Sequence, residues 1–388
     1  MKLTRSLIFL ALITAMVLAP GLALLARAVQ PGLLDGLLPV KLSGVTNPAA
    51  PPQLGLQAWL NGATQSAFEP WLAEKMGRPR EIYLRLKNGY DYVLGRSDVI
   101  SIGREGVLNG KSYVEEWCLR AERAKTEADV APLLASVIAV HETLKARKKP
   151  FVFMFSPSKA AVMPEYLPSW CAPADRPRAY DVLLTGLKAA NVPVIDGHVI
   201  ALQTKATEKW WPFGRDGAHW NDVGQFFAVQ ALMVELQRQL GHPVADLALG
   251  EVKVDTTPIG AEADAGLIAN LPFTLYPSSP HASFDVRNQQ SMPAGLFVGT
   301  SFSWGPLQIM MGEKMFAHSK FYYYFSSIYA YDPGDKVGRL EEIKAAADLG
   351  GFLDKVDFVV LEANEAELGI GHLASFAAAA KALPEAPR

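Results

Sequence analysis

The sequence has few cysteines and no excess of basic charge, and both shortages exclude classes of function. Only 2 of the 388 residues are cysteine, and no Cys/His spacing typical of a metal site occurs. The formal net charge is -2, so the chain lacks the basic surface that nucleic-acid binding requires. A glycine-rich phosphate loop is also missing. We therefore expect no metal, no cofactor and no nucleic-acid partner.

Apolar residues, in contrast, are plentiful. Hydrophobic residues make up 50% of the chain, which is ample for a core in one large α/β domain or two smaller ones. Near the N-terminus, Lys2 and Arg5 precede an apolar run from Leu7 to Leu25. This run approaches the length of about 20 residues that spans a bilayer. We expect residues 1–28 to be a secretory signal or, as we favour, an uncleaved anchor, with the rest of the chain outside the cytoplasm.

The two cysteines, Cys118 and Cys171, agree with export. One disulfide between them is typical of an exported protein. The alternative is a pair of free, buried thiols.

Strands that alternate with helices predict a parallel sheet covered on both faces. We expect strands at Phe151–Phe155, Val192–Ile195, Gly295–Val298, Lys320–Tyr331 and Asp357–Leu361, and a hairpin over Val99–Gly110. We expect helices at Phe68–Lys87, Val130–Arg147, Arg178–Ala190, Arg339–Ala347, after Asn221 and after Leu373. Residues 29–64 are interpreted as a linker and 65–388 as one domain. Two parts of that domain break the pattern: a loop over Ser156–Pro168 and an irregular or β-rich insertion over about 242–290.

Ser301 lies where a short apolar strand turns sharply into a helix that begins near Pro306. A strand, a tight turn and a helix in succession display a nucleophile above the carboxyl edge of a parallel sheet. The alternative is that Ser301 only caps the following helix.

Asp216 and His219 lie on one loop directly before the helix that Asn221 begins. A serine hydroxyl needs a base to become nucleophilic, and a carboxylate orients that base. We therefore predict that Asp216 orients His219 and that His219 activates Ser301. A capping carboxylate and a half-exposed ring are the alternative.

Four further residues are lesser candidates for oxyanion or substrate binding, beside the backbone N–H of Ser301. These are Thr300, Asn364, Lys159 and Trp304. Lys159 is equally compatible with bracing a loop, and Trp304 with packing a wall of the site. The tyrosines between Tyr322 and Tyr331 are better explained by strand propensity than by sugar binding.

Four tracts together resemble the SGNH-hydrolase-like alginate O-acetyltransferases of the AlgJ and AlgX type. They are Ile102–Asn109, Ser156–Lys159 with Pro164–Pro168, Asp216–Asn221 and Gly299–Ser303. As in that family, and unlike ordinary SGNH hydrolases, the histidine tract precedes the serine tract. The chain departs from the family at Gly217, which stands where the family has its aspartate, and at Val107, which replaces a tryptophan.

This resemblance implies a three-layer, flavodoxin-like parallel sheet flanked by helices, with a circularly permuted motif order. It also implies a periplasmic enzyme, anchored to the inner membrane, that transfers acetyl groups to an exopolysaccharide through Ser301, His219 and Asp216. The implied partners are the polysaccharide, a membrane-bound O-acyltransferase as acetyl donor, and a synthesis and export complex. Two alternatives remain: a carbohydrate acetylesterase with the same triad, and a non-catalytic polysaccharide-binding subunit.

Overall fold

The computed structural model describes residues 14, 42–44, 51–53, 55–76, 78–118, 127–171, 177–258, 260–275, 277–341, 349–369 and 371–383. The chain forms two compact units. One contains the described residues up to Val99 together with Gly266–Leu275, and the other contains Ile100–Ala265 and the described part of 276–388. The expected N-terminal signal or anchor lies outside the described residues, apart from Thr14. Within the described part, no helix has the length and apolar character needed to cross a membrane.

The first unit is helical. Its helices are α2 (Leu56–Leu60), α3 (Ala63–Met76) and α4 (Arg78–Val93). The predicted linker thus contains α2 and the start of α3, and the helix predicted over Phe68–Lys87 is divided between α3 and α4. Side chains of α4 hold the segment after Gly266: Arg85 Nη1 and Asn88 Nδ2 donate to backbone carbonyls of Leu271 and Ala269, each at 2.9 Å.

The second unit is built on a seven-stranded sheet in the order β10-β9-β8-β7-β11-β3-β4. Its strands are β3 (Phe151–Ser156), β4 (Val194–Asp196), β7 (Gly295–Gly299), β8 (Ser319–Tyr323), β9 (Ser327–Tyr331), β10 (Arg339–Glu341) and β11 (Phe358–Asn364). The five strands from β8 to β4 are parallel, whereas β9 and β10 form an antiparallel edge. The central strands β3, β7 and β11 are buried along their whole length, as expected for strands covered on both faces.

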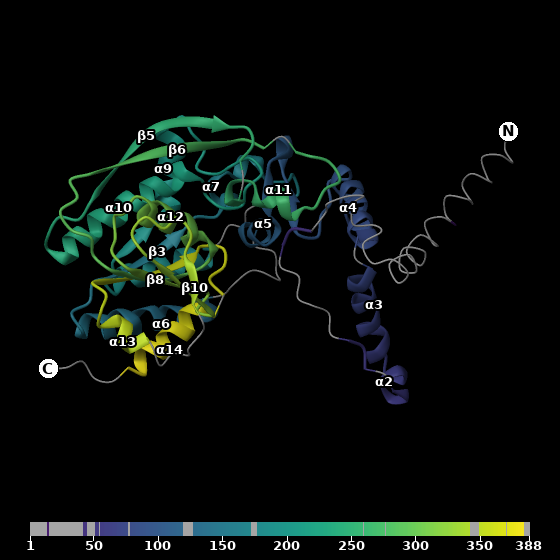
Figure 1. The fold of residues 1–388 in the computed structure, drawn as a ribbon, viewed down its shortest axis with the longest axis horizontal. Helices are drawn as coiled ribbons and strands as arrows, with labels where there is room; N and C mark the ends of the chain where they lie inside the picture. The colour runs from purple at the N-terminus through teal and green to yellow at the C-terminus, as the bar shows by residue number, and fades with distance from the viewer. Residues whose placement is uncertain are drawn as a thin grey trace. The chain divides into compact units, whose positions relative to one another are not determined.

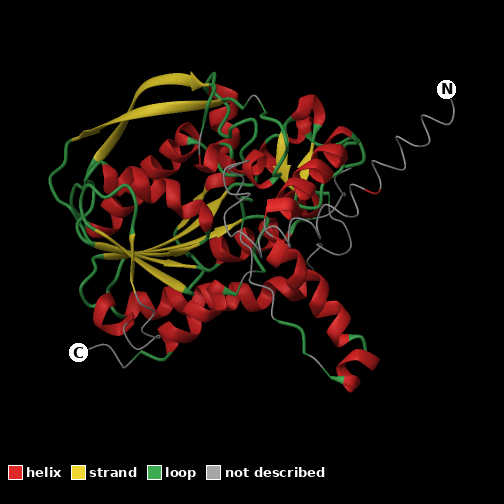
Figure 2. Cartoon of the chain, turned by 45° about the vertical axis from the view of Figure 1, so that its right-hand side comes forward, coloured by secondary structure: helices red, strands yellow, loops and turns green. Residues whose placement is uncertain are grey.

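Helices cover both faces of this sheet, so the unit has three layers (Figure 2). On one face lie α6 (Glu127–Ala146), α8 (Ala179–Ala189), α13 (Leu349–Leu353) and α14 (His372–Lys381), which share a core with inward side chains of β3, β7 and β11. On the other lie α9 (Gly197–Thr207), α10 (Asp222–Leu240) and α12 (Trp304–Gly312) (Figure 1). Leu232, Leu307 and Met310 from these helices line a small cavity together with Met154 and Val360 of the sheet. The predicted three-layer α/β fold is therefore confirmed.

The predicted insertion forms a long antiparallel ribbon. Its strands are β5 (Asp246–Asp255) and β6 (Ser279–Arg287), and both contact α10 (Figure 1). Between them lie the 3-10 turn η3 (Gly260–Glu262) and α11 (Asp264–Ile268). The predicted hairpin is also present, as β1 (Ile100–Ile102) and β2 (Leu108–Gly110) around η1 (Arg104–Gly106).

Three predicted elements differ from the structure. The aromatic strand over Lys320–Tyr331 is two strands, β8 and β9, because Tyr324 and Phe325 take left-handed conformations (φ 49° and 54°) and reverse the chain. The helix over Arg339–Ala347 begins instead as the edge strand β10, and 342–348 lie outside the described residues. The loop over Ser156–Pro168 contains two short helical turns, α7 (Lys159–Val162) and η2 (Pro164–Tyr166).

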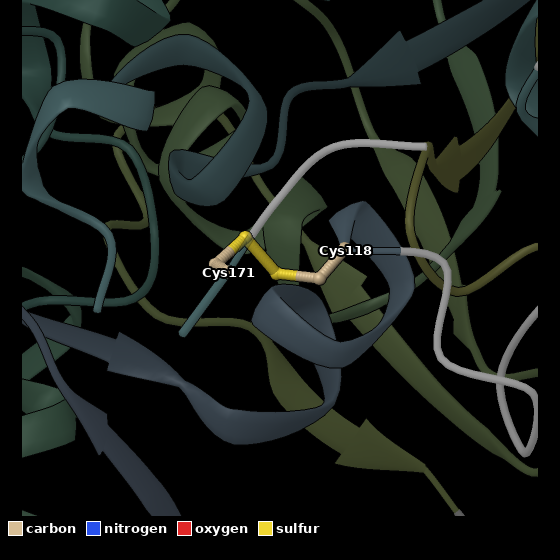
Figure 3. Close-up of a disulfide and its surroundings, with 2 residues drawn as sticks. All are labelled: Cys118 and Cys171. Carbon is tan, nitrogen blue, oxygen red and sulfur yellow. A yellow bond between two sulfur atoms is a disulfide. The ribbon is translucent and has the colours of Figure 1, made fainter. Parts of the chain in front are cut away.

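Cys118 and Cys171 form the expected disulfide (Figure 3). Cys118 directly follows α5 (Lys111–Trp117), and the bridge joins residues 53 apart in the chain. It therefore ties α5 to the chain that follows η2.

Candidate active site

Ser301 lies at the carboxyl end of β7, in the turn that leads to α12. Thr300 is the N-cap of the 3-10 turn η4 (Ser301–Ser303), and its side chain accepts a hydrogen bond from Phe302 N. Gly299 is required at the end of β7, because a Cβ there would lie 2.6 Å from Glu362 Oε2. The strand, turn and helix predicted around Ser301 are thus present.

A buried carboxylate, Glu362 on β11, lies beneath this turn and is only 1% exposed. It accepts hydrogen bonds from Thr300 N at 2.6 Å, Ser303 Oγ at 2.9 Å and Ser156 Oγ at 2.5 Å. A carboxylate is an acceptor with room for several donors, so Glu362 fixes the turn on both sides of Ser301. Sequence reasoning treated Glu362 only as part of the strand end and missed this role.

His219 approaches Ser301 from the loop before α10. Its Nε2 lies 2.7 Å from Ser301 Oγ, and its Nδ1 lies 2.7 Å from Asp264 Oδ2. The other carboxylate oxygen, Asp264 Oδ1, accepts the backbone N–H of Ala218 at 2.7 Å. Asp264 therefore orients both the imidazole and the loop that carries it.

The prediction that Asp216 orients His219 is wrong in its geometry. Asp216 is 3% exposed and faces Lys159 and Arg215 instead. Burial raises the pKa of Asp216, and the two cations oppose that rise. The carboxylate bonded to His219 comes from the start of α11, 45 residues further along the chain. No local spacing indicated Asp264, because it follows an irregular insertion.

Lys159 braces the loop that carries His219. Its buried Nζ donates to the carbonyls of Leu108 at 2.7 Å, Gly214 at 2.7 Å, Arg215 at 2.8 Å and Gly217 at 2.9 Å. Burial lowers the pKa of Lys159 to about 7, while Asp216 and Asp264 oppose the fall. Of the two predicted roles, the structure supports loop bracing.

The other lesser candidates do not point a free donor at Ser301. The Asn364 amide donates to carbonyl oxygens of Pro157 at 3.1 Å and Ser156 at 3.4 Å. The Thr300 hydroxyl bonds to Glu362 at 2.9 Å. Trp304 packs edge-on against Phe321 and Tyr329, with ring centroids 4.8 and 4.6 Å apart.

Tyr324 was predicted only as one of the tyrosines of an aromatic strand, so its place beside Ser301 was not foreseen. Its Oη lies 3.5 Å from Ser301 Oγ. Burial raises the pKa of Tyr324 to about 12. The aromatic run around it indicated a strand, and nothing in the sequence marked the tight turn that presents this side chain.

A second buried polar network lies where β11 ends. Glu365 is fully enclosed and accepts Arg178 Nη1 at 2.9 Å and Ser158 N at 2.6 Å. Burial opposes its ionisation, yet Arg178 and His198 hold the pKa of Glu365 below its usual value. Arg178 also contacts Glu116 of α5 at 2.6 Å. The network thus links the helix that ends at the disulfide to the carboxyl edge of the sheet.

One group within the described residues has the donors to hold a divalent cation. The ligand atoms of Asp222, Glu262 and His281 lie within 4.8 Å of one another. Asp222 Oδ2 already pairs with His281 Nδ1 at 2.6 Å. Burial, and then the charge of Asp222, raise the pKa of Glu262 to about 7.

A parallel α/β sheet with a serine, a histidine and a carboxylate bonded in series at its carboxyl edge is the arrangement of the SGNH-hydrolase-like class. The family model "SGNH hydrolase-like domain, acetyltransferase AlgX" matches residues 113–308. That match spans half of the chain, and the protein belongs to this family of acetyltransferases.

The fold also has weak likenesses among solved structures. The O-acetyltransferase domain of Pseudomonas putida AlgJ is 22% identical, with 70% of this chain and 92% of that chain covered and a TM-score of 0.45. Pseudomonas aeruginosa AlgX is 14% identical, with 74% and 70% covered and a TM-score of 0.42. Bacillus cereus PatB1 is 12% identical, with 63% and 92% covered and a TM-score of 0.38. These likenesses are too weak to add to the family match. No curated protein matches the sequence.

Proposed function

We propose that the protein is an O-acetyltransferase that acetylates hydroxyl groups of an exopolysaccharide through an acetyl-enzyme on Ser301. The observation that carries this proposal is the series Ser301 Oγ, His219 Nε2, His219 Nδ1 and Asp264 Oδ2, joined at 2.7 Å and 2.7 Å, in a chain of an acetyltransferase family.

In the first half-reaction, Ser301 Oγ attacks the carbonyl carbon of an acetyl ester while His219 Nε2 takes the hydroxyl proton. Asp264 accepts the Nδ1–H bond and stabilises the imidazolium that results. When the tetrahedral intermediate collapses, His219 returns the proton to the departing oxygen. Ser301 is left as an acetyl ester.

In the second half-reaction, a sugar hydroxyl attacks the acetyl-enzyme. His219 takes the proton from that hydroxyl and gives it to Ser301 Oγ as the ester bond breaks. The products are the acetylated sugar and free serine. If water attacks instead, the same groups hydrolyse the ester, so a transferase must exclude water at this step.

The proposal includes a location and partners. The basic residues ahead of the apolar run Leu7–Leu25 and the disulfide Cys118–Cys171 support a periplasmic protein anchored to the inner membrane. A membrane-bound O-acyltransferase would supply the acetyl group there, and a polysaccharide synthesis and export complex would supply the polymer.

The test is acetyl transfer by the purified protein from a chromogenic acetyl ester, with and without a polysaccharide oligomer. Wild type should acetylate the oligomer, and Ser301→Ala and His219→Ala should lose the activity by several orders of magnitude. Release of acetate that no acceptor suppresses would favour an esterase. If the protein binds the polymer without acetylating it, and Ser301→Ala binds the polymer equally well, the protein is a non-catalytic binding subunit.

A further inference from the structure

We propose that Tyr324 is a catalytic residue whose hydroxyl donates a hydrogen bond to the oxyanion formed when Ser301 attacks an acetyl ester. The inference rests on the proposed function and adds a residue to it. Tyr324 lies outside the residues that match the family model, so it is assigned from geometry alone.

The position of the hydroxyl is the first argument. Tyr324 Oη lies 3.5 Å from Ser301 Oγ, and both the side chain and the backbone amide of Ser301 affect its pKa. The oxyanion forms on the carbon that becomes bonded to Oγ, and effective donors lie about 2.7–3.1 Å from it. A substrate carbonyl oxygen placed between the Ser301 N–H and the Tyr324 hydroxyl would accept a hydrogen bond from each.

The backbone of Tyr324 is held against the strand that carries the nucleophile. Tyr324 N donates to Gly299 O at 2.8 Å, two residues before Ser301. Its φ of 49° is unusual for a large side chain, and such strain persists only where the surroundings fix it. The turn between β8 and β9 therefore holds the backbone of Tyr324 in a fixed conformation beside Gly299.

Competing side-chain donors are occupied. The amide of Asn364 is bonded to carbonyls, and the Thr300 hydroxyl is bonded to Glu362. A tyrosine hydroxyl is protonated at neutral pH in any case, and burial raises the pKa of Tyr324 further, to about 12, so the hydroxyl can donate.

The atoms and electrons of the attack step balance without any proton from Tyr324. The Oγ–C bond forms, the carbonyl π electrons move onto oxygen, and the Ser301 proton goes to His219 Nε2. Tyr324 keeps its own proton and only shares it with the oxyanion. Its hydroxyl should therefore act on kcat far more than on KM.

The experiment is steady-state acetyl transfer from a chromogenic acetyl ester to a polysaccharide oligomer, followed by release of the chromophore, with wild type, Tyr324→Phe and Tyr331→Phe. Removing one oxyanion donor typically lowers kcat about 10²–10³-fold, and we expect that loss in Tyr324→Phe with KM little changed. Tyr331→Phe is the matched control, because Tyr331 lies on β9 at the end of the hairpin away from the turn. Equal kcat values in wild type and Tyr324→Phe would overturn the proposal.

A spectroscopic readout separates donation from mere packing. With a ¹³C-labelled acetyl group, the infrared carbonyl band of the acetyl-enzyme should shift to higher frequency in Tyr324→Phe. An unchanged band would refute donation even if kcat fell. Tyr324→Asn serves if the Phe variant folds poorly, because asparagine tolerates the left-handed turn. If wild type shows no Ser301-dependent acetyl band, the acetyl-enzyme itself is refuted. If wild type shows the band and the variants show it at the same frequency, only the role of Tyr324 is refuted.

Discussion

Asp264 orients the candidate catalytic histidine, although nothing in the local sequence predicts this role. It bonds to His219 Nδ1 and to the backbone of Ala218, although 45 residues separate it from the histidine. Asp216 has the better local spacing but lies buried beside Lys159. Proximity along the chain therefore identified the wrong carboxylate.

We expect Asp264→Asn to lower kcat/KM for an acetyl ester by about 10²–10⁴-fold, because the amide no longer holds the imidazole in the tautomer that accepts the serine proton. Asp216→Asn is the matched comparison and should cost less than about tenfold. Parallel steady-state kinetics of the two variants check this. The opposite ranking would restore Asp216 as the partner of His219.

Much of the site could nonetheless be predicted. Ser301 and His219 each lie where a strand or loop meets a helix, and the carboxyl ends of parallel strands converge, so their meeting follows from topology. Tyr324 and Glu362 could not be found this way. The left-handed turn at Tyr324 carries no glycine or asparagine signal, and the contacts of Glu362 depend on β11 lying beside β7.

At the scale of elements, the loop from Gly214 to His219 has little regular structure of its own. It is held by the Lys159 ammonium and by Leu108 of β2, whose N–H donates to Arg215 O at 3.1 Å. The hairpin β1–β2, the turn α7 and the histidine loop thus form one hydrogen-bonded assembly. These are three of the four tracts that resemble the AlgJ and AlgX family. The hairpin and the turn α7 support the loop that carries His219.

Lys159→Met should lower the free energy of unfolding by about 3 kcal/mol or more, because several buried carbonyls lose their donor. It should also reduce kcat by loosening His219. Urea unfolding at pH 6, where the wild-type ammonium is protonated, measures the first effect. Lys205→Met is the control: Lys205 Nζ donates to Val162 O at 2.9 Å and pairs with a half-exposed Glu165, so its loss should cost about 1 kcal/mol or less. Equal costs would show that Lys159 is not a brace.

At the scale of the whole molecule, one partly buried carboxyl makes stability depend on pH. Glu262 has a pKa raised to about 7 by burial and by Asp222, and its Oε1 is buried without a hydrogen-bond partner among the described residues. In the folded protein it holds its proton up to about pH 7, whereas in the unfolded chain it loses that proton near its ordinary pKa of about 4.3. The folded state therefore binds more protons between these values, and its stability falls as pH rises through this window.

Glu262→Gln should remove this fall and make the protein more stable than wild type at pH 8, by about 1–2 kcal/mol after allowance for solvent screening. Thermal and urea unfolding between pH 4 and 8, with EDTA present to exclude bound cations, test it. The exposed Glu251→Gln, which breaks a surface pair with Lys253, should leave the pH dependence unchanged. A wild-type stability that is flat from pH 4.5 to 7 would contradict the expectation.

The strand order of the sheet has a consequence for the timing of synthesis. β11 pairs with β3 on one side and β7 on the other, yet it is made after every other strand of the sheet. Until it arrives, the half that contains β3 and the half that contains β7 have no common neighbour, and long-range pairing of this kind forms slowly. The same strand brings Glu362, which fixes the turn around Ser301. In a nascent chain, the turn around Ser301 would therefore stay unformed while β8, β9 and β10 are translated. Ser301 would become reactive only when β11 fills the centre of the sheet.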